Sequence, residues 1–359
     1  MFIRASSTTI PTHTLTKATD SASLKPQTLD RVESSVAFLS PGELDFHRQG
    51  RRFKDLERFK RNVGSQEIRQ NDLGELVNSF PGRNGYQEKF LGKPLSLDKV
   101  AGSRKDELVS LTGKPGETEL TYTNFSVLMH KERRQPLLTA VNIDGAKVVS
   151  VPRKGKWTID GRIPRDAQLG NEAYKGNPID RGHMVRRRDP VWGPNPDRAS
   201  NDTFAFTNAG LQHGSLNQKT WLDLENYILE QAQERHQKLT VLTGPVFSPD
   251  DPTFDNRGRM DKPTQIPQEF WKVVVWNDSE EGLKGAAFLQ SQKDYLGRGI
   301  FKTDFSPGEM SVYQMPLDDL GKLTGLDFGD IGDTSSGTRI LRSGREAELA
   351  APSSRNRVA

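Results

Sequence analysis

The sequence predicts an α+β domain preceded by a long polar segment, and three observations lead to this prediction. From about Thr121 onward, short apolar, β-branched and aromatic runs are bounded by Gly, Pro, Asp and Asn, as is typical of sheet strands. One segment among them has the 3.6-residue periodicity of an amphipathic helix. The first 110 residues have neither pattern, and a mean hydropathy of −0.70 with 33% hydrophobic residues is low for a chain that is compact throughout.

Residues 1–110 are rich in Ser, Thr, Gln, Lys and Arg, and their apolar residues are scattered singly. We expect a partly disordered or partner-docking arm that contributes little to the core, because such a segment cannot bury enough apolar surface to offset its ordering entropy. Within the arm, the highly charged stretch Glu43–Gln66 is a candidate for a solvated helix.

The core is expected between residues 111 and 330. Five runs are predicted strands: FSVLMHKER, PLLTAVNIDG, KLTVLTGPVF, EFWKVVVWN and LKGAAFLQ. A helix is predicted from Leu216 to about His236, because Trp221, Leu224 and Ile228 fall on one face of it. A shorter helix is predicted over Leu317–Leu323. Residues 331–359 are polar again and are expected to form a flexible tail.

The composition excludes several kinds of site. With no cysteine, the chain has no disulfide, no thiolate zinc site and no cysteine nucleophile. No run approaches the roughly 18 to 20 apolar residues of a membrane span, and the N-terminus lacks the apolar stretch of a secretory signal. We therefore expect cytoplasmic synthesis, no membrane partner, and export only by a non-classical route. The formal charge of +4, from 51 basic and 47 acidic residues, fits a polyanionic partner, although local clustering must carry that argument.

The most informative segment is Asp180-Arg181-Gly182-His183-Met184. Hydrolysis of a phosphodiester needs a base to activate water and cationic donors for the phosphoryl oxygens. Histidine suits the first task and arginine the second. In an extended strand Arg181 and His183 would face one site, while Gly182 leaves the opposite side open for close approach. Asp180 can either orient a ring nitrogen or brace the turn.

Three consecutive arginines, Arg186 to Arg188, follow this segment. A charge run is usually a solvated strand end, but three like charges beside the proposed site favour an edge that tracks phosphates. Trp192 is the one nearby aromatic candidate for base stacking. This pattern favours recognition of backbone charge rather than of base identity.

Two residues of the predicted helix complete the candidate site. Asn217 stands at its start, where Asn is usually an N-cap; a neutral amide oxygen is also a good single ligand for Mg²⁺, so both roles stay open. Glu225 lies eight residues further, which raises it by about 12 Å along a straight helix. It is therefore assigned to metal-bound water rather than to the metal, with an ordinary solvent-facing glutamate as the alternative.

Taken together, DRGHM, TNAGLQ, LNQ and WLDLE resemble the DNA/RNA non-specific endonucleases, the endonuclease G-like group of ββα-metal or His-Me finger nucleases. The expected order of strand (181–187), strand (203–212) and helix (216–236) matches the finger of that group. Further likeness extends over about 200 residues: LTGPVF, IPQEFWKVVVW and YQMPLDDLGKLTGLDF. The resemblance implies a finger domain built on a mainly antiparallel sheet with flanking helices.

By position, the resemblance makes His183 the general base and Asn217 the sole protein ligand of one Mg²⁺, for which Mn²⁺ can substitute. Glu225 would bond to the water shell of the metal. The implied products are 5′-phosphate and 3′-hydroxyl ends of DNA and RNA. Arg181 would be a phosphate-contacting cation, and Asn208 would support the site next to the histidine. With Arg186 and Arg187 from the charge run, these are the candidate substrate-binding residues. The group usually has a further upstream arginine, for which Arg133 and Arg134 are the candidates.

Rival functions remain at this point. One alternative is a nucleic-acid-binding relative that has lost catalysis, but the base, cation and ligand positions are all filled. A metalloprotease is disfavoured because the chain has no H-E-x-x-H. The biological role is open between a toxin, a defence effector and a housekeeping nuclease, and the arm is the expected contact for any partner or inhibitor protein. The sequence does not fix the oligomeric state.

Overall fold

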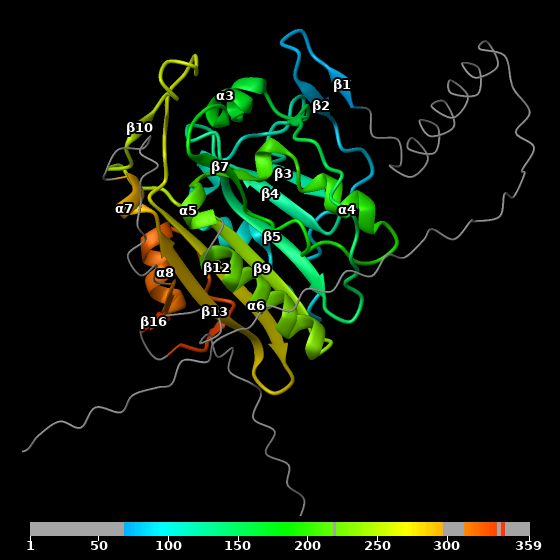
Figure 1. Ribbon diagram of the computed structural model, residues 1–359. Coiled ribbons are helices and arrows are strands. Elements are labelled where there is room, and N and C mark those ends of the chain that lie inside the picture. The colour runs from blue at the N-terminus through cyan, green and yellow to red at the C-terminus, as the bar shows by residue number, and fades with distance from the viewer. Residues whose placement is uncertain (1–67, 218–219, 297–311, 336–338, 342–359) are drawn as a thin grey trace, which may run out of the picture. The chain divides into compact units, whose positions relative to one another are not determined.

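The computed structural model describes residues 68–217, 220–296, 312–335 and 339–341, all within one compact unit, 54–359 (Figure 1). The fold is α+β with a mainly antiparallel sheet, as the sequence predicts. The candidate helix at Glu43–Gln66, with most of the expected arm and tail, lies outside the described residues. No helix among the described residues is long and apolar enough to cross a membrane.

A nine-stranded sheet forms the centre of the unit. Its order is β16-β14-β13-β12-β9-β5-β4-β3, and β15 pairs with β13 as the one parallel neighbour in it. Its strands are β3 (Glu119–Tyr122), β4 (Phe125–Met129), β5 (Pro136–Asp144), β9 (Lys238–Val246), β12 (Glu269–Asp278), β13 (Gly282–Ser291), β14 (Val312–Met315), β15 (Gly332–Asp333) and β16 (Arg339–Leu341). All five predicted strands are confirmed as members of this sheet.

The smaller sheets and the helices surround this centre. The remaining strands are β1 (Arg69–Gln70), β2 (Leu76–Asn78), β6 (Ile159–Asp160), β7 (Ile179–His183), β8 (Ala209–His213), β10 (Thr253–Phe254) and β11 (Thr264–Gln265). The helices are α2 (Leu97–Ala101), α3 (Asn171–Tyr174), α4 (Pro196–Asp202), α5 (Gly214–Asn217), α6 (Thr220–Glu234), α7 (Lys293–Leu296) and α8 (Leu317–Thr324). Short 3₁₀ turns cover Gly102–Glu107, Arg165–Ala167 and Phe206–Asn208.

The central sheet is buried on both faces. On one face Val274 packs in the same cluster as Leu224 of α6, and on the other Val273 packs in the same cluster as Leu320 of α8. Neither face of the sheet is exposed to solvent, so the strand sequences are nearly continuous apolar runs and do not alternate strictly between apolar and polar residues. The strands are therefore predicted from their composition and not from a two-residue periodicity.

The predicted helices are confirmed with changed bounds. The single helix expected over 216–236 consists of α5 and α6, and the buried face of α6 contains Trp221, Leu224 and Ile228, as predicted. The second helix, α8, ends at Gly325, whose φ of 72° is the left-handed conformation that glycine adopts without strain.

The two strands expected at the site are shorter than predicted. β7 ends at His183, because the backbone N–H groups of Met184 and Val185 turn to the carbonyl and side-chain oxygens of Asn208. β8 begins only at Ala209, after α4 and the 3₁₀ turn. A side-chain amide that binds nearby backbone groups competes with the sheet ladder, and a pattern of apolar residues does not reveal such competition.

β7 and β8 form a two-stranded sheet of their own, separate from the central sheet. Two buried glutamines connect β8 to the rest of the unit. The backbone N–H of Leu211 donates to Gln135 Oε1 at 3.0 Å, and that of His213 donates to Gln292 Oε1 at 2.7 Å. Both glutamine side chains are fully buried, so these bonds are shielded from water.

The expected arm boundary at residue 110 is wrong. Residues 68–110 contain β1, β2 and α2, and they bury Phe80, Leu95 and Val100 in the two main core clusters. Arg83 makes a two-pronged ion pair with Asp202, 2.9 Å on each side, and both side chains are fully buried. These apolar residues are scattered in the sequence because they lie mostly in loops, which lack the regular spacing of buried residues that helices and strands have. The tail boundary also differs, since β15 and β16 join the sheet.

Candidate active site

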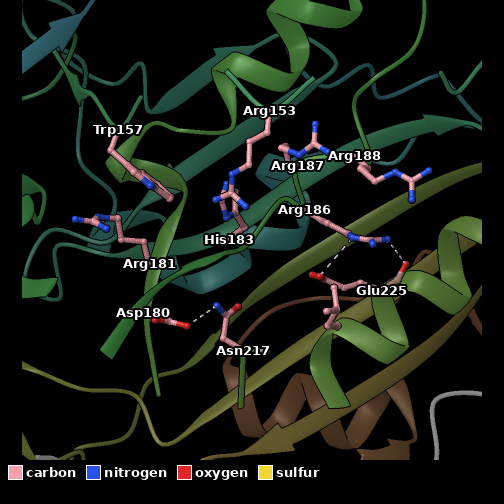
Figure 2. A pocket seen from close by; sticks show the side chains of 11 residues that line it. Arg153, Trp157, Asp180, Arg181, His183, Arg186, Arg187, Arg188, Asn217 and Glu225 are labelled. Atoms are coloured by element: carbon pink, nitrogen blue, oxygen red, sulfur yellow. Dashed lines mark hydrogen bonds and ion pairs between the residues drawn. The ribbon is translucent and has the colours of Figure 1, made fainter. Parts of the chain in front are cut away.

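A cavity of 670 Å³ collects most of the predicted site residues (Figure 2). Its lining consists of Arg153, Trp157, Asp180, Arg181, His183, Arg186, Arg187, Arg188, Asn217, Leu222 and Glu225. Five of these side chains are guanidinium groups and two are carboxylates, so the lining is strongly cationic. Such a cavity attracts anionic substrates.

Strand β7 presents Arg181 and His183 to this cavity, as the alternation of a strand predicts. Gly182 faces the opposite side, where the Gln212 side chain of β8 packs directly against it. A Cβ at position 182 would lie 2.0 Å from Gln212 Oε1. Any side chain there would push β7 and β8 apart, so the glycine sets the close approach behind the histidine.

The His183 imidazole lies between aromatic rings. Its centroid is 4.9 Å from that of Trp157 and 5.2 Å from that of Phe204, and its Nε2 is buried without a hydrogen-bond partner in the described part of the chain. Burial, together with the charges of Arg153 and Arg187, lowers the pKa of His183 to about 3. The ring is therefore neutral at physiological pH, the form that a general base needs, while burial and the two cations weaken its basicity.

Arg181 is held by an aromatic enclosure. Its guanidinium carbon lies 5.4 Å from the ring centre of Tyr174 and 5.7 Å from those of Trp157 and Phe206. One terminal nitrogen donates to Asn171 Oδ1 at 2.6 Å. These contacts orient the guanidinium without neutralising it by a carboxylate, and an oriented, unneutralised guanidinium suits phosphate binding.

Asn217 lies across the cavity from Arg181 at the end of α5. Its Nδ2 donates to Asp180 Oδ2 at 3.0 Å, which fixes the amide and leaves Oδ1 as its remaining acceptor (Figure 2). Asp180 therefore braces the asparagine in this structure. Among the described residues no group of three His, Cys, Asp or Glu could hold a metal ion. A single hard oxygen donor that leaves the rest of the shell to water and phosphate is the arrangement that suits Mg²⁺.

Glu225 is buried and is no solvent-facing helix residue, with only 7% of its surface exposed. Burial raises the pKa of Glu225, and the charges of Lys272 and Arg186 counteract this effect. Arg186 Nε lies 3.8 Å from Glu225 Oε2, and one terminal nitrogen of Arg186 donates to the Glu225 carbonyl at 2.8 Å.

The three arginines expected to track phosphates have different environments. Arg186 lines the cavity but is buried, and its terminal nitrogens donate to the Glu225 carbonyl and to the Asn226 side chain of α6, so its expected role in substrate binding stays a prediction. Arg187 and Arg188 are half-buried at the cavity wall. Arg187 donates to the Val151 carbonyl and to Ser200 Oγ, both at 3.2 Å.

Asn208 supports the site from behind rather than contacting substrate. It is fully buried, and its Nδ2 donates to the carbonyls of Val185 and Thr203 at 3.0 Å each. Its side-chain bonds among the described residues all go to backbone groups, which agrees with the expected supporting role beside the histidine and not with a direct substrate contact. Its effect is to fix the turn that follows His183.

Arg153 and Trp157 are site residues that the sequence reasoning missed. Arg153 is exposed, its guanidinium carbon lies 5.1 Å from the Phe204 ring centre, and it reaches toward His183 (Figure 2). The available signal was the basic run Arg153-Lys154-Gly155-Lys156-Trp157, which is unusual in combining cations, a glycine and an aromatic residue.

The residues expected in those roles lie elsewhere. Arg133 pairs with Asp251 at 2.9 Å, and Arg134 donates to the Lys262 and Pro263 carbonyls. Neither lines the cavity. Trp192 donates its Nε1 to the Asn142 carbonyl at 2.7 Å and is likewise no part of the lining. The upstream arginine at the site is Arg153, and the aromatic residue is Trp157.

Asp189, buried behind the cavity, makes stability depend on pH. Burial, opposed mainly by Arg186, raises its pKa to about 7, against roughly 3.9 for an unfolded chain. The folded protein thus retains a proton that the unfolded chain releases, and the stabilisation from this group, fully present below pH 4, is lost as pH rises through 7. We expect Asp189→Asn to gain stability relative to the native protein by up to about 1.4 kcal/mol per pH unit between pH 4 and 7.

Denaturant unfolding of both proteins between pH 4 and 7 measures the difference in their free energies of unfolding. This difference would not change with pH if Asp189 were ionised throughout the range. His183 acts with opposite sign, because its lowered pKa makes stability fall as pH drops from about 6.5 toward 3. Since both proteins contain His183, its contribution cancels in the comparison.

The chain is similar in sequence to several known proteins. The uncharacterized protein y4fB of Sinorhizobium fredii is 35% identical over 275 residues, which cover 71% of this chain and 40% of that protein. Mitochondrial endonuclease G of Bos taurus is 31% identical over 192 residues, 51% of this chain and 62% of that protein, and the Homo sapiens enzyme is 31% identical over 176 residues, 45% and 56%. The chain thus spans less than two thirds of the length of these relatives.

Among solved structures, a chain of the EndoG/EndoGI complex matches 59% of this chain and 85% of its own length, with 18% identity and a TM-score of 0.45. The family model described as DNA/RNA non-specific endonuclease matches residues 107–335, which is more than half of the chain and contains the entire cavity lining. This chain belongs to the DNA/RNA non-specific endonuclease family.

Proposed function

We propose that the protein is a metal-dependent endonuclease that hydrolyses phosphodiester bonds of DNA and RNA with little sequence preference and leaves 5′-phosphate and 3′-hydroxyl ends. The observation that carries this proposal is the cavity itself. It brings a neutral imidazole, several guanidinium groups and an amide whose oxygen accepts no hydrogen bond from the described residues within one cationic space. Each supplies one requirement of phosphodiester hydrolysis.

His183 is the proposed general base. In the free cavity the ring is neutral, and a bound phosphate, by offsetting the charges of Arg153 and Arg187, would raise the basicity of the ring so that it can accept the proton of the attacking water. Arg181, Arg153 and the exposed parts of Arg187 and Arg188 bind the phosphoryl oxygens. No base-specific hydrogen-bonding set is needed for this, which supports weak sequence preference.

Asn217 Oδ1 is the proposed ligand of one Mg²⁺, with Glu225 nearby on α6 as the carboxylate that bonds to the water shell. The bound metal would act as a Lewis acid that stabilises charge on the phosphate and the leaving oxygen. The chain's own contribution is to fix the donor: Asp180 holds Nδ2 of Asn217 and thereby aims the amide oxygen. A catalytically inactive relative is disfavoured because the base, cation and ligand positions are all present in one cavity.

The function is tested by incubating the full chain with several unrelated plasmids and with a structured RNA, with Mg²⁺, with Mn²⁺, and with a chelator. Degradation of both polymers that requires the metal is expected. Cleavage should weaken steeply as salt rises, because phosphate contacts supply most of the affinity. Discrete fragments determined by sequence, or cleavage that persists in the chelator, would contradict the proposal.

Asn217→Ala should make cleavage depend on higher Mg²⁺ concentration. Loss of the amide oxygen weakens metal binding, and we expect activity at limiting Mg²⁺ to fall by about 10- to 100-fold and to recover partly when Mg²⁺ is raised. The measurement is a Mg²⁺ titration of initial rates beside a thermal melt. Asn171→Ala, which removes the amide that binds Arg181 instead, is the matched control and should leave the Mg²⁺ midpoint unchanged. An unchanged midpoint for Asn217→Ala, with only a lower melting temperature, would reduce Asn217 to a structural residue.

A further inference from the structure

A lysine is buried among the apolar residues of strand β12 of the central sheet. Lys272 of β12 is 1% exposed, and its neighbours Trp271 and Val273 are fully buried. Burying an ammonium group without compensation is costly, so its contacts must offset the loss of water. Its strand position places it on the same sheet face as Val274, which is the face that α6 covers.

The Lys272 ammonium group has three contacts. Nζ donates to Thr243 Oγ1 on β9 at 3.0 Å, lies 3.5 Å from Glu225 Oε1 on α6, and is 4.9 Å from the ring centre of Trp221. The ammonium therefore bridges the central sheet to the first half of α6. The one carboxylate it contacts belongs to the cavity lining.

The Glu225 carboxylate is held from two sides. Lys272 approaches Oε1, and Arg186 Nε approaches Oε2 at 3.8 Å. Asp189, itself 5% exposed, is the other acidic member of this buried group, which thus contains two cations and two carboxylates. Lys272 and Arg186 are the charges that oppose the effect of burial on the pKa of Glu225.

This arrangement is a poor way to stabilise the fold alone. A buried ion pair often contributes no more than apolar residues of similar volume would, whereas loss of one partner leaves an uncompensated charge. An apolar side chain at position 272 would continue the run of Val273 and Val275, so stability does not explain the lysine. The partner that needs it is Glu225.

We propose that Lys272 is a positioning residue, which from inside the sheet holds the Glu225 carboxylate in place at the cavity wall. Lys272 itself does not line the cavity and does not touch substrate. The inference rests on the proposed nuclease function for its catalytic consequence, but the coupling between Lys272 and Glu225 is a property of the folded chain alone.

The test is a double-mutant cycle in the full chain with Lys272→Met, Glu225→Gln and the two combined. Methionine keeps the length of the lysine stem and removes the charge. Val274→Ala is the matched control, because it removes buried volume from the same strand and face without touching Glu225. Initial rates on plasmid and denaturant unfolding are both measured for each protein.

We expect Lys272→Met to lower the cleavage rate about 10- to 100-fold, whereas Val274→Ala lowers the unfolding midpoint and leaves the rate within about 3-fold. In the Glu225→Gln background a neutral amide already replaces the carboxylate, so Lys272→Met should change the cleavage rate by less than about 2-fold. The double variant should also unfold at a higher denaturant concentration than Lys272→Met alone, because Lys272→Met leaves two buried acidic groups facing one cation, whereas the double variant leaves Arg186 facing Asp189 alone.

Additive effects on the rate would overturn the proposal, as would a Lys272→Met protein that behaves like Val274→Ala. If Lys272→Met does not fold, the proposal is tested by comparing the cleavage rates of Glu225→Gln and the double variant. A rate about 10-fold lower in the double variant than in Glu225→Gln would contradict positioning through Glu225. If the native chain cleaves no nucleic acid, the proposed function fails. The unfolding measurements of the same variants still show whether Lys272 and Glu225 are coupled.

Discussion

His183→Ala is expected to lower the rate of phosphodiester cleavage about 10²- to 10⁴-fold, the usual loss when a general base is removed. The ring lies against Trp157 and Phe204, and its burial, together with the charges of two arginines, keeps it neutral. The other cations of the cavity are proposed to bind phosphate without it. Affinity for nucleic acid should therefore change by no more than a few-fold. Single-turnover cleavage and binding to a labelled oligonucleotide measure the two quantities separately.

The matched control for this variant is His236→Asn, which alters an exposed histidine just after α6. Asparagine tolerates the positive φ of 50° at that position. This control should retain native cleavage and binding. A His183→Ala protein with near-native turnover at neutral pH would remove the residue from the mechanism, and a parallel loss of binding would make it a substrate contact instead.

Deletion of residues 1–106 is expected to abolish folding, whereas a chain that starts at Ile68 should fold. The longer deletion removes Phe80, Leu95 and Val100 from the core, and each buried side chain of this kind contributes about 1.5–3 kcal/mol. It also leaves Asp202 as a buried charge without Arg83, at a cost of about 3–5 kcal/mol. These losses together match the whole stability of an ordinary domain, about 5–15 kcal/mol.

Circular dichroism and thermal unfolding of the two shortened chains provide the measurement. Arg83→Met in the full chain isolates the ion pair, and it should lower stability even though every apolar contact remains. Cooperative unfolding of the Glu107-start chain at the temperature of the full chain would show that residues 68–106 are dispensable.

The sequence predicted the core of the domain and the centre of the site, for reasons that can be traced to particular residues. Strands such as Glu269–Asp278 were found because both faces are buried, so composition alone marks them. Arg181, His183, Asn217 and Glu225 were found because they belong to short motifs with regular spacing, and they do line one cavity.

The missed features depend on contacts that no local pattern encodes. Arg153 reaches the cavity from a loop 30 residues before His183, and nothing in its spacing indicates that approach. The sequence does not distinguish residues 68–110 from a polar arm, because their buried apolar side chains lie mostly in loops and show no periodicity. Arg186 could not be separated from its neighbours by charge, since only the turn after β7 directs it into the protein. Lys272 did give a signal, a single lysine within an apolar run.

The separation of the β7–β8 pair from the central sheet has a consequence for how members of this family can vary. The side chains proposed for the reaction on β7 and α5 lie outside the sheet, to which Gln135 and Gln292 connect the backbone of β8, and Met184 packs in the same cluster as Phe270 of β12. Substitutions elsewhere in the sheet are therefore expected to leave the register of β7 unchanged, provided that these contacts remain. The pair is in this sense a module, and a few contacts limit which scaffolds can carry it.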